Sequence, residues 1–114
     1  MYATDGLFFT IKNKGQYKIM PHEVLFLEAD GFSTKFYMVY QKEPYIVSMN
    51  LSNVAPYFPT SDFFRLSRSL VINLDHLERI ADEKLYLKTN DKALQIPTAN
   101  KQALMQNLLV IKTK

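Results

Sequence analysis

Short apolar segments separated by turn residues run through most of this 114-residue chain. In residues 32–40, large apolar side chains recur at even spacing, and this period of two predicts a strand with one buried face. Those side chains are Phe32, Phe36, Met38 and Tyr40. Gly15 lies between the segments 7–12 and 16–20, where it permits the positive φ that a tight hairpin turn requires. The pattern favours a fold built mainly from strands.

The rest of the chain continues this pattern, with two exceptions that favour helices. Further strands are expected at 24–29, 45–49, 63–73, 79–81, 84–89 and 93–96. Asn50 is a suitable N-cap for a helix over 51–55, which Pro56 limits to one or two turns. Thr98 precedes a second helix over 99–109, where apolar residues lie four apart. The sequence therefore predicts strands with one short internal helix and a C-terminal helix.

The residue types present argue against several classes of function. Cysteine is absent, which excludes disulfides, iron–sulfur clusters and thiolate zinc sites. With two histidines and no G-x-S-x-G or H-E-x-x-H pattern, little remains for a nucleophile or a metal site. His76 is interpreted as part of a polar turn in which Asp75 makes an Asx contact. The three glycines lie too far apart for a phosphate-binding loop. We expect no enzyme activity, no catalytic residue, no metal and no cofactor.

Length and charge place limits on domain number and location. A chain of this length is expected to form one domain, over 1–114. No apolar run approaches the roughly 20 residues of a membrane span, and the N-terminus lacks a signal-peptide pattern, so a cytoplasmic protein is expected. The formal charge of +3 comes wholly from the second half, because residues 1–61 hold five lysines and five acidic residues. Such a charge attracts polyanions only modestly.

Arg65 and Arg68 lie three residues apart with a hydroxyl side chain between them. On a regular strand this odd step would place them on opposite faces, which predicts a bend or turn near residues 67–69 with Arg68 at its end. Phe63 and Phe64 are assigned to the core, because the paired aromatic pattern of an RNA-binding sheet is missing. Two interpretations of the arginines remain open: ordinary surface charges, or contacts to a nucleic acid.

Residues 63–80, FFRLSRSLVINLDHLERI, resemble the signature of the LytTR family of bacterial DNA-binding domains. Three further segments resemble elements of that family in the same order: 23–37 a strand–turn–strand unit, 49–59 a short helix, and 94–108 the closing strand and helix. The resemblance covers about residues 20–109. It implies a mainly β fold of small antiparallel sheets stacked as an elongated sandwich, with the C-terminal helix packed at one side.

The resemblance also implies a function. The family binds double-stranded DNA through loops at sheet edges that enter successive major grooves, in transcriptional regulators that include response regulators of two-component systems. It further implies paired repeat sites, a possible homodimer on DNA and a receiver or sensor partner. Since the chain begins with Met1 shortly before the first strand, a stand-alone regulator or a fragment is expected. The alternative is a protein-interaction or dimerisation module with little DNA affinity, which the small net charge favours.

Two of the implied DNA contacts lie in turns. The loop after Asp30 and Gly31 holds Ser33, Thr34 and Lys35, of which Thr34 offers a hydroxyl or methyl group and Lys35 a contact to phosphate or guanine. At the second position, Arg68 is suited to bidentate contact with guanine O6 and N7. Arg65 and Ser67 accompany it, and Ser67 stands where the family commonly has histidine.

The third implied contact is the start of the last helix. Asn100 stands where the family often has arginine, and it can read adenine or hold a phosphate, with Lys101 beside it. Lys84 lies near a position that touches the DNA backbone. The complete expected set is Ser33, Thr34, Lys35, Arg65, Ser67, Arg68, Lys84, Asn100 and Lys101.

Overall fold

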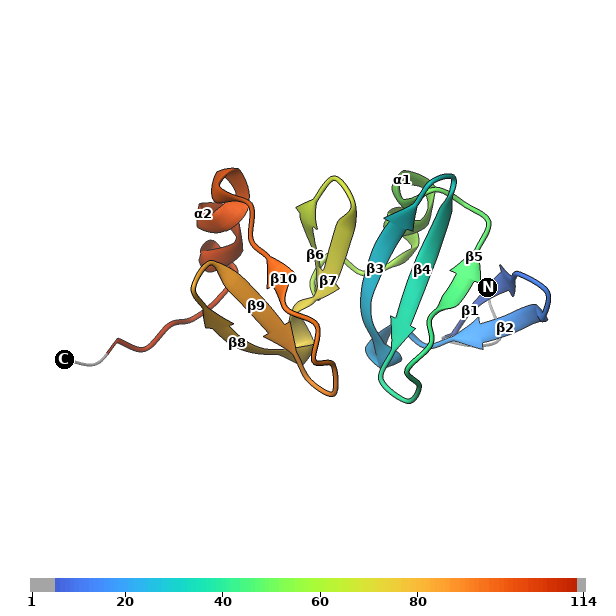
Figure 1. Cartoon of the computed structure of the whole chain (residues 1–114), viewed down its shortest axis with the longest axis horizontal. Coiled ribbons are helices and arrows are strands. Elements are labelled where there is room, and N and C mark those ends of the chain that lie inside the picture. Colours follow the sequence, from blue (N-terminus) through green and yellow to red (C-terminus); the bar gives the residue numbers. More distant parts are fainter. Residues whose placement is uncertain (1–5, 113–114) are drawn as a thin grey trace.

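The computed structural model describes residues 6–112. Over this part of the chain, ten strands form two antiparallel sheets, with two α-helices beside them (Figure 1). The strands are β1 (Leu7–Ile11), β2 (Gly15–Ile19), β3 (Val24–Asp30), β4 (Ser33–Met38), β5 (Tyr45–Val47), β6 (Phe63–Ser67), β7 (Leu70–Asn73), β8 (Leu77–Ala81), β9 (Lys84–Leu87) and β10 (Leu94–Gln95). The helices are α1 (Leu51–Val54) and α2 (Thr98–Gln106), and short 3-10 turns lie at Pro21–Glu23, Ala55–Tyr57 and Leu74–His76.

The strands are arranged along one direction. One sheet has the order β2-β1-β5-β4-β3-β7-β6 and the other the order β10-β9-β8. The molecule measures 52 × 31 × 24 Å. Along its long axis, the β1–β2 hairpin lies at one end and α2 with the three-stranded sheet at the other (Figure 1). This arrangement confirms the predicted mainly β fold of small antiparallel sheets stacked as an elongated sandwich.

Strand β3 separates two hydrophobic cores. Val24 and Leu27 belong to the first core, which α1 helps to close. Leu25 and Phe26 belong to the second core, which is shared with the three-stranded sheet and with Leu104 of α2. A β-bulge in the pairing with β4 lies between Val24 and Phe26, and it allows the adjacent Leu25 and Phe26 to face the same core. Because β3 is buried on both sides, it joins the two halves of the molecule.

The two helices begin in different ways. Asn50 caps α1 as predicted, since its Oδ1 accepts a hydrogen bond from the backbone N–H of Asn53 at 2.9 Å. Helix α2 begins at Thr98, with Pro97 in the N-cap position and no side-chain cap, and it ends at Gln106. The predicted end of this helix was therefore three residues too late. Neither helix of residues 6–112 is long and apolar enough to cross a membrane.

Residues 63–73, expected as a strand with a bend, form two strands with a complete chain reversal. Strands β6 and β7 pair antiparallel around the turn at residues 68–69, which confirms the predicted turn near residues 67–69. The polar turn after β7 is fixed by a different residue from the one expected. Oδ1 of Asn73, and not the Asp75 carboxylate, accepts a hydrogen bond, from the backbone N–H of Asp75 at 3.0 Å.

The alternation predicted for residues 32–40 holds only within β4, whose inward side chains are buried. Phe32 is 92% exposed and Tyr40 is 51% exposed, so the expectation that both lie on the buried face was wrong. Gly31, at a φ of 61°, reverses the chain before β4 begins. Phe32 therefore belongs to the turn and not to the strand.

Candidate nucleic-acid interface

Three chain segments meet along one long edge of the molecule. They are the β3–β4 turn, the β6–β7 turn and the first turn of α2, all at the top in Figure 1. The backbone N–H of Ala29 donates to the carbonyl of Ser69 at 2.8 Å, which places the first two segments side by side. Nδ2 of Asn100 donates to the carbonyl of Leu66 at 2.7 Å, which fixes the start of α2 against the end of β6. We call residues 30–33, 67–70 and 97–101 the loop edge.

Arg65, an exposed residue of β6, holds the β6–β7 turn. Its Nε donates to the carbonyl of Ser67 at 2.8 Å, and its Nη2 donates to the carbonyl of Arg68 at 2.7 Å. The strand is also bulged between Arg65 and Ser67, and Oγ of Ser67 accepts from the backbone N–H of Ser69 at 3.3 Å. Arg65 and Ser67, both expected as DNA contacts, are therefore engaged in the structure of the turn itself.

Arg68 is presented at the tip of this turn. Its side chain is exposed, and the neighbouring backbone is fixed by the two bonds from Arg65. Within residues 6–112, the guanidinium forms no hydrogen bond and no ion pair. A planar cation of this kind, held on a rigid turn and free of a carboxylate, is suited to a fork-shaped acceptor pair such as guanine O6 and N7.

The three residues expected in the first loop differ in accessibility. Thr34 is fully buried, and its Oγ1 donates to the carbonyl of Met49 at 2.8 Å. Its hydroxyl and methyl groups have no surface with which to reach a base, so the expected role of Thr34 is wrong for this conformation. Ser33 and Lys35 lie at alternate positions of β4 and remain partly exposed.

At the start of α2, the expected contact residue Lys101 is already engaged in an ion pair. Nζ of Lys101 lies 2.6 Å from Oε1 of Glu83 in the β8–β9 turn. Sequence reasoning missed Glu83, because nothing local relates a turn to a helix 18 residues later. Lys84, the next residue, is exposed at the start of β9. Asn100 is used to hold the helix, as described above, so of the three residues expected in this region only Lys84 has an unengaged side chain among the described residues.

A polar link connects the two sheets. The Tyr37 hydroxyl donates to Oε1 of Glu28 at 3.0 Å, and Nζ of Lys92 lies 3.2 Å from Oε2 of the same carboxylate. Burial, followed by this hydrogen bond and the Glu28 charge, raises the pKa of Tyr37 to about 12. The phenol thus stays protonated and keeps donating to Glu28 even at a pH near its ordinary pKa of 10.0.

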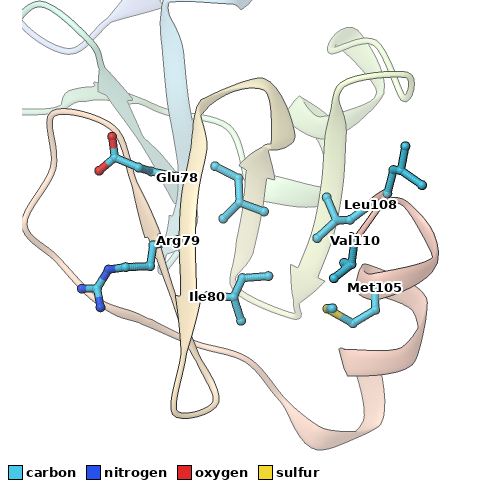
Figure 2. Close-up of a pocket in the computed structure, with 8 residues that line it drawn as sticks. Glu78, Arg79, Ile80, Met105, Leu108 and Val110 are labelled. Carbon is cyan, nitrogen blue, oxygen red and sulfur yellow. The ribbon is translucent and has the colours of Figure 1, made fainter. Parts of the chain in front are cut away.

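Elsewhere among the described residues, neighbouring side chains form an apolar groove or hydrogen bonds that hold the fold together. A groove between β8 and the C-terminal part of α2 is lined by Leu77, Ile80, Met105 and Leu108, while Glu78 and Arg79 point away from it (Figure 2). The side chain of His76 contacts the backbone of the other histidine, since its Nε2 donates to the carbonyl of His22 at 2.7 Å. Within residues 6–112, no group of three or more acidic or histidine side chains is arranged to hold a metal ion.

A family description named "LytTr DNA-binding domain" matches residues 14–109. The chain belongs to the LytTR family. LytTR is a family of DNA-binding domains. No protein with a curated description is similar enough in sequence to match. The family membership confirms the resemblance found in the four sequence segments.

The LytTR fold is also found by comparison with solved structures. The chain is similar to the LytTr DNA-binding domain of a Bacillus cereus protein described as a methyl-accepting/DNA response regulator, with a TM-score of 0.73 and 14% sequence identity. The similarity covers 92% of this chain and 97% of that one. At this level of identity it supports the LytTR fold and carries no residue role across.

Proposed function

We propose that this LytTR domain binds double-stranded DNA sequence-specifically as part of a bacterial transcriptional regulator, with the loop edge entering successive major grooves. The observation that carries the proposal is the unengaged Arg68 guanidinium on a braced turn at the middle of that edge. A cation held in this way keeps its charge for a ligand. For a DNA-binding domain, that ligand is a base edge or a phosphate group of the DNA.

The order of the three segments along the loop edge supports contact with more than one groove. The long axis of the molecule measures 52 Å, of which the loop edge occupies only the part between the β3–β4 turn and α2, and one turn of B-DNA rises by about 34–36 Å. The β3–β4 turn and the start of α2 flank the β6–β7 turn along this axis (Figure 1). A duplex lying along the loop edge would therefore present different grooves to different segments.

The proposal gives each residue of the expected set except the buried Thr34 a role that matches its engagement. Arg68 reads guanine, and Ser33 lies beside the same groove. Lys35 and Lys84 neutralise phosphates, and Lys101 does so after leaving Glu83. Arg65, Ser67 and Asn100 act through the backbone that they hold.

The test begins with in vitro selection of bound duplexes from a random pool. On a selected site, Arg68→Ala should weaken binding by about 5- to 150-fold and relax the preference at one base pair. Arg79→Ala is the matched control, because Arg79 is also exposed but lies over the ring of Tyr86 at 3.9 Å on β8. Equal effects of the two substitutions, or a pool that shows no enrichment, would contradict the proposal.

The proposal extends to the setting of the domain. We include a cytoplasmic location, binding of two protomers to paired repeats, and a receiver or sensor domain as the upstream partner. The same selection tests the second point, because a dimeric footprint gives two half-sites at a fixed separation. A single half-site in every enriched duplex would argue for binding as a monomer.

A protein-interaction or dimerisation module is the second candidate function. The formal charge of only +3 favours it, as does the ion pair that neutralises Lys101. The two candidates differ in non-specific binding, which depends on phosphate contacts and is strongest at low salt. Failure to bind random duplex DNA even at low salt would favour the interaction module.

A further inference from the structure

The inference concerns Phe32 at the tip of the β3–β4 turn. At 92% exposure, it is the most exposed large apolar side chain among residues 6–112. Isolated apolar residues on a surface are common, but a phenyl ring that loses almost none of its surface on folding contributes nothing to the hydrophobic core. Its position on the loop edge offers another role for it.

The turn that carries Phe32 is well fixed. Asp30 and Ser33 face each other as the last pair of the β3–β4 ladder, so only Gly31 and Phe32 lie outside it. The next residue, Thr34, is buried and bonded to the carbonyl of Met49. The ring is thus presented on a closed hairpin and not on a mobile loop.

Phe32 lies close to Arg68 on the same edge. Ala29 and Ser69 are joined by a backbone hydrogen bond, and Arg68 immediately precedes Ser69. Phe32 follows Ala29 by three residues around the turn, which places it roughly 5–10 Å from that bond along the strand direction. A major groove is about 12 Å wide, so one groove accommodates both side chains.

The exposed side chains of the β3–β4 turn indicate which DNA group the turn is suited to contact. Besides Phe32 it exposes the carboxylate of Asp30 and contains no cation, so it is unsuited to phosphate. In the major groove, the C5-methyl group of thymine is the apolar feature that a phenyl ring can contact. Resting on the DNA-binding function proposed above, we propose that Phe32 contacts a thymine methyl group in the groove that Arg68 enters, and so makes thymine a determinant of the binding site.

The experiment removes the methyl group from the DNA instead of altering the protein alone. In a selected duplex, each thymine is replaced in turn by deoxyuridine, which differs only by that methyl group. The wild-type domain should lose about three- to fivefold in affinity at one position, and Phe32→Ala should bind the thymine and deoxyuridine duplexes equally. Phe8→Ala is the control, because Phe8 is 62% exposed on β1, which is outside the loop edge.

Each outcome separates this inference from the proposed function. Deoxyuridine sensitivity in the wild type and in Phe8→Ala, with none in Phe32→Ala, would support the thymine contact. Binding that no deoxyuridine weakens, sensitivity that persists in Phe32→Ala, or a selected site without thymine would overturn the contact while leaving DNA binding intact. A pool without enrichment would overturn both.

Discussion

At the scale of single residues, the structure separates side chains that are free to contact a ligand from side chains that hold the backbone of the turns in place. Arg65 is the clearest example of the second kind, because its guanidinium bonds two carbonyl groups of the β6–β7 turn. Replacement of Arg65 by alanine should lower affinity for a selected duplex by roughly fivefold, through loss of order at Arg68. The salt dependence of binding should stay unchanged, since no phosphate contact is lost. Fluorescence anisotropy over a range of salt concentrations measures both quantities.

The conservative variant Arg65→Lys distinguishes bracing from charge. Lysine keeps the positive charge but has no planar fork with which to reach two carbonyls. We expect it to behave like the alanine variant. Full affinity in Arg65→Lys, together with a loss in Arg65→Ala, would show that charge at this position matters and that the bracing does not.

Glu83 restrains a cation that the proposed function needs. Because its carboxylate is paired with Lys101, Glu83→Gln should free the ammonium group and raise DNA affinity by about two- to fivefold. Asp82→Asn changes the net charge equally at a neighbouring exposed position with no ion pair in residues 6–112. The gain should also vanish in a Lys101→Ala background. Equal gains from the two acidic substitutions would assign the effect to net charge.

At the scale of elements, Asn73 fixes the junction of β7 with the 3-10 turn that follows. The side chain is buried, Nδ2 donates to the carbonyl of Val24 at 2.9 Å, and Oδ1 accepts from Asp75. Asn73→Ala leaves buried backbone groups unpaired and should lower the free energy of unfolding by about 1–3 kcal/mol. Urea denaturation measures the change. Asn53→Ala, on the exposed face of α1, should alter stability by less than about 0.5 kcal/mol, and a similar loss there would contradict this role.

The elements also indicate what sequence patterns can and cannot reveal. Apolar periodicity and turn residues predicted nearly every strand, since burial of one face and reversal of the chain are decided locally. The placement of Phe32 was wrong because the even spacing of apolar residues in β4 extends back into the turn that contains Gly31 and Phe32. Thr34 was chosen for its hydroxyl group, but whether that group reaches solvent or Met49 depends on packing between elements. The pairing of Glu83 with Lys101 is equally invisible, because it joins segments that only the fold brings together.

At the scale of the whole molecule, the polar link between the sheets predicts a pH effect on stability. The folded state raises the pKa of Tyr37 to about 12, above its ordinary value of 10.0, so it binds the phenolic proton more tightly than the unfolded chain does. This contribution is fully present below pH 10 and is lost as the pH rises toward 12. Phenylalanine at this position cannot titrate. The stability advantage of the wild type over Tyr37→Phe should therefore be constant from pH 7 to 9 and shrink above pH 10. Chemical denaturation at each pH measures it, and a difference that does not vary with pH would contradict the assignment.

The small number of cations near the loop edge predicts a weak response to salt. Lys35, Lys84 and Lys101 are the proposed phosphate contacts, and each contact contributes a slope of about −0.9 to log K against log[salt]. One protomer should therefore give a slope of about −3 on a half-site. A value near zero would argue against these contacts, and a much steeper value would require cations elsewhere on the surface. Isothermal titration at several salt concentrations gives the slope.

Burial of β3 on both faces has a mechanical consequence. Since one strand is part of both cores, neither half of the molecule can rotate against the other without exposing apolar side chains to water. The separation between the β3–β4 turn and α2 is thus fixed when the protein is free. Any misfit with the pitch of the double helix has to be absorbed by curvature of the DNA, so operator sequences that contain flexible pyrimidine–purine steps should be bound more tightly than stiff ones with identical contacted bases.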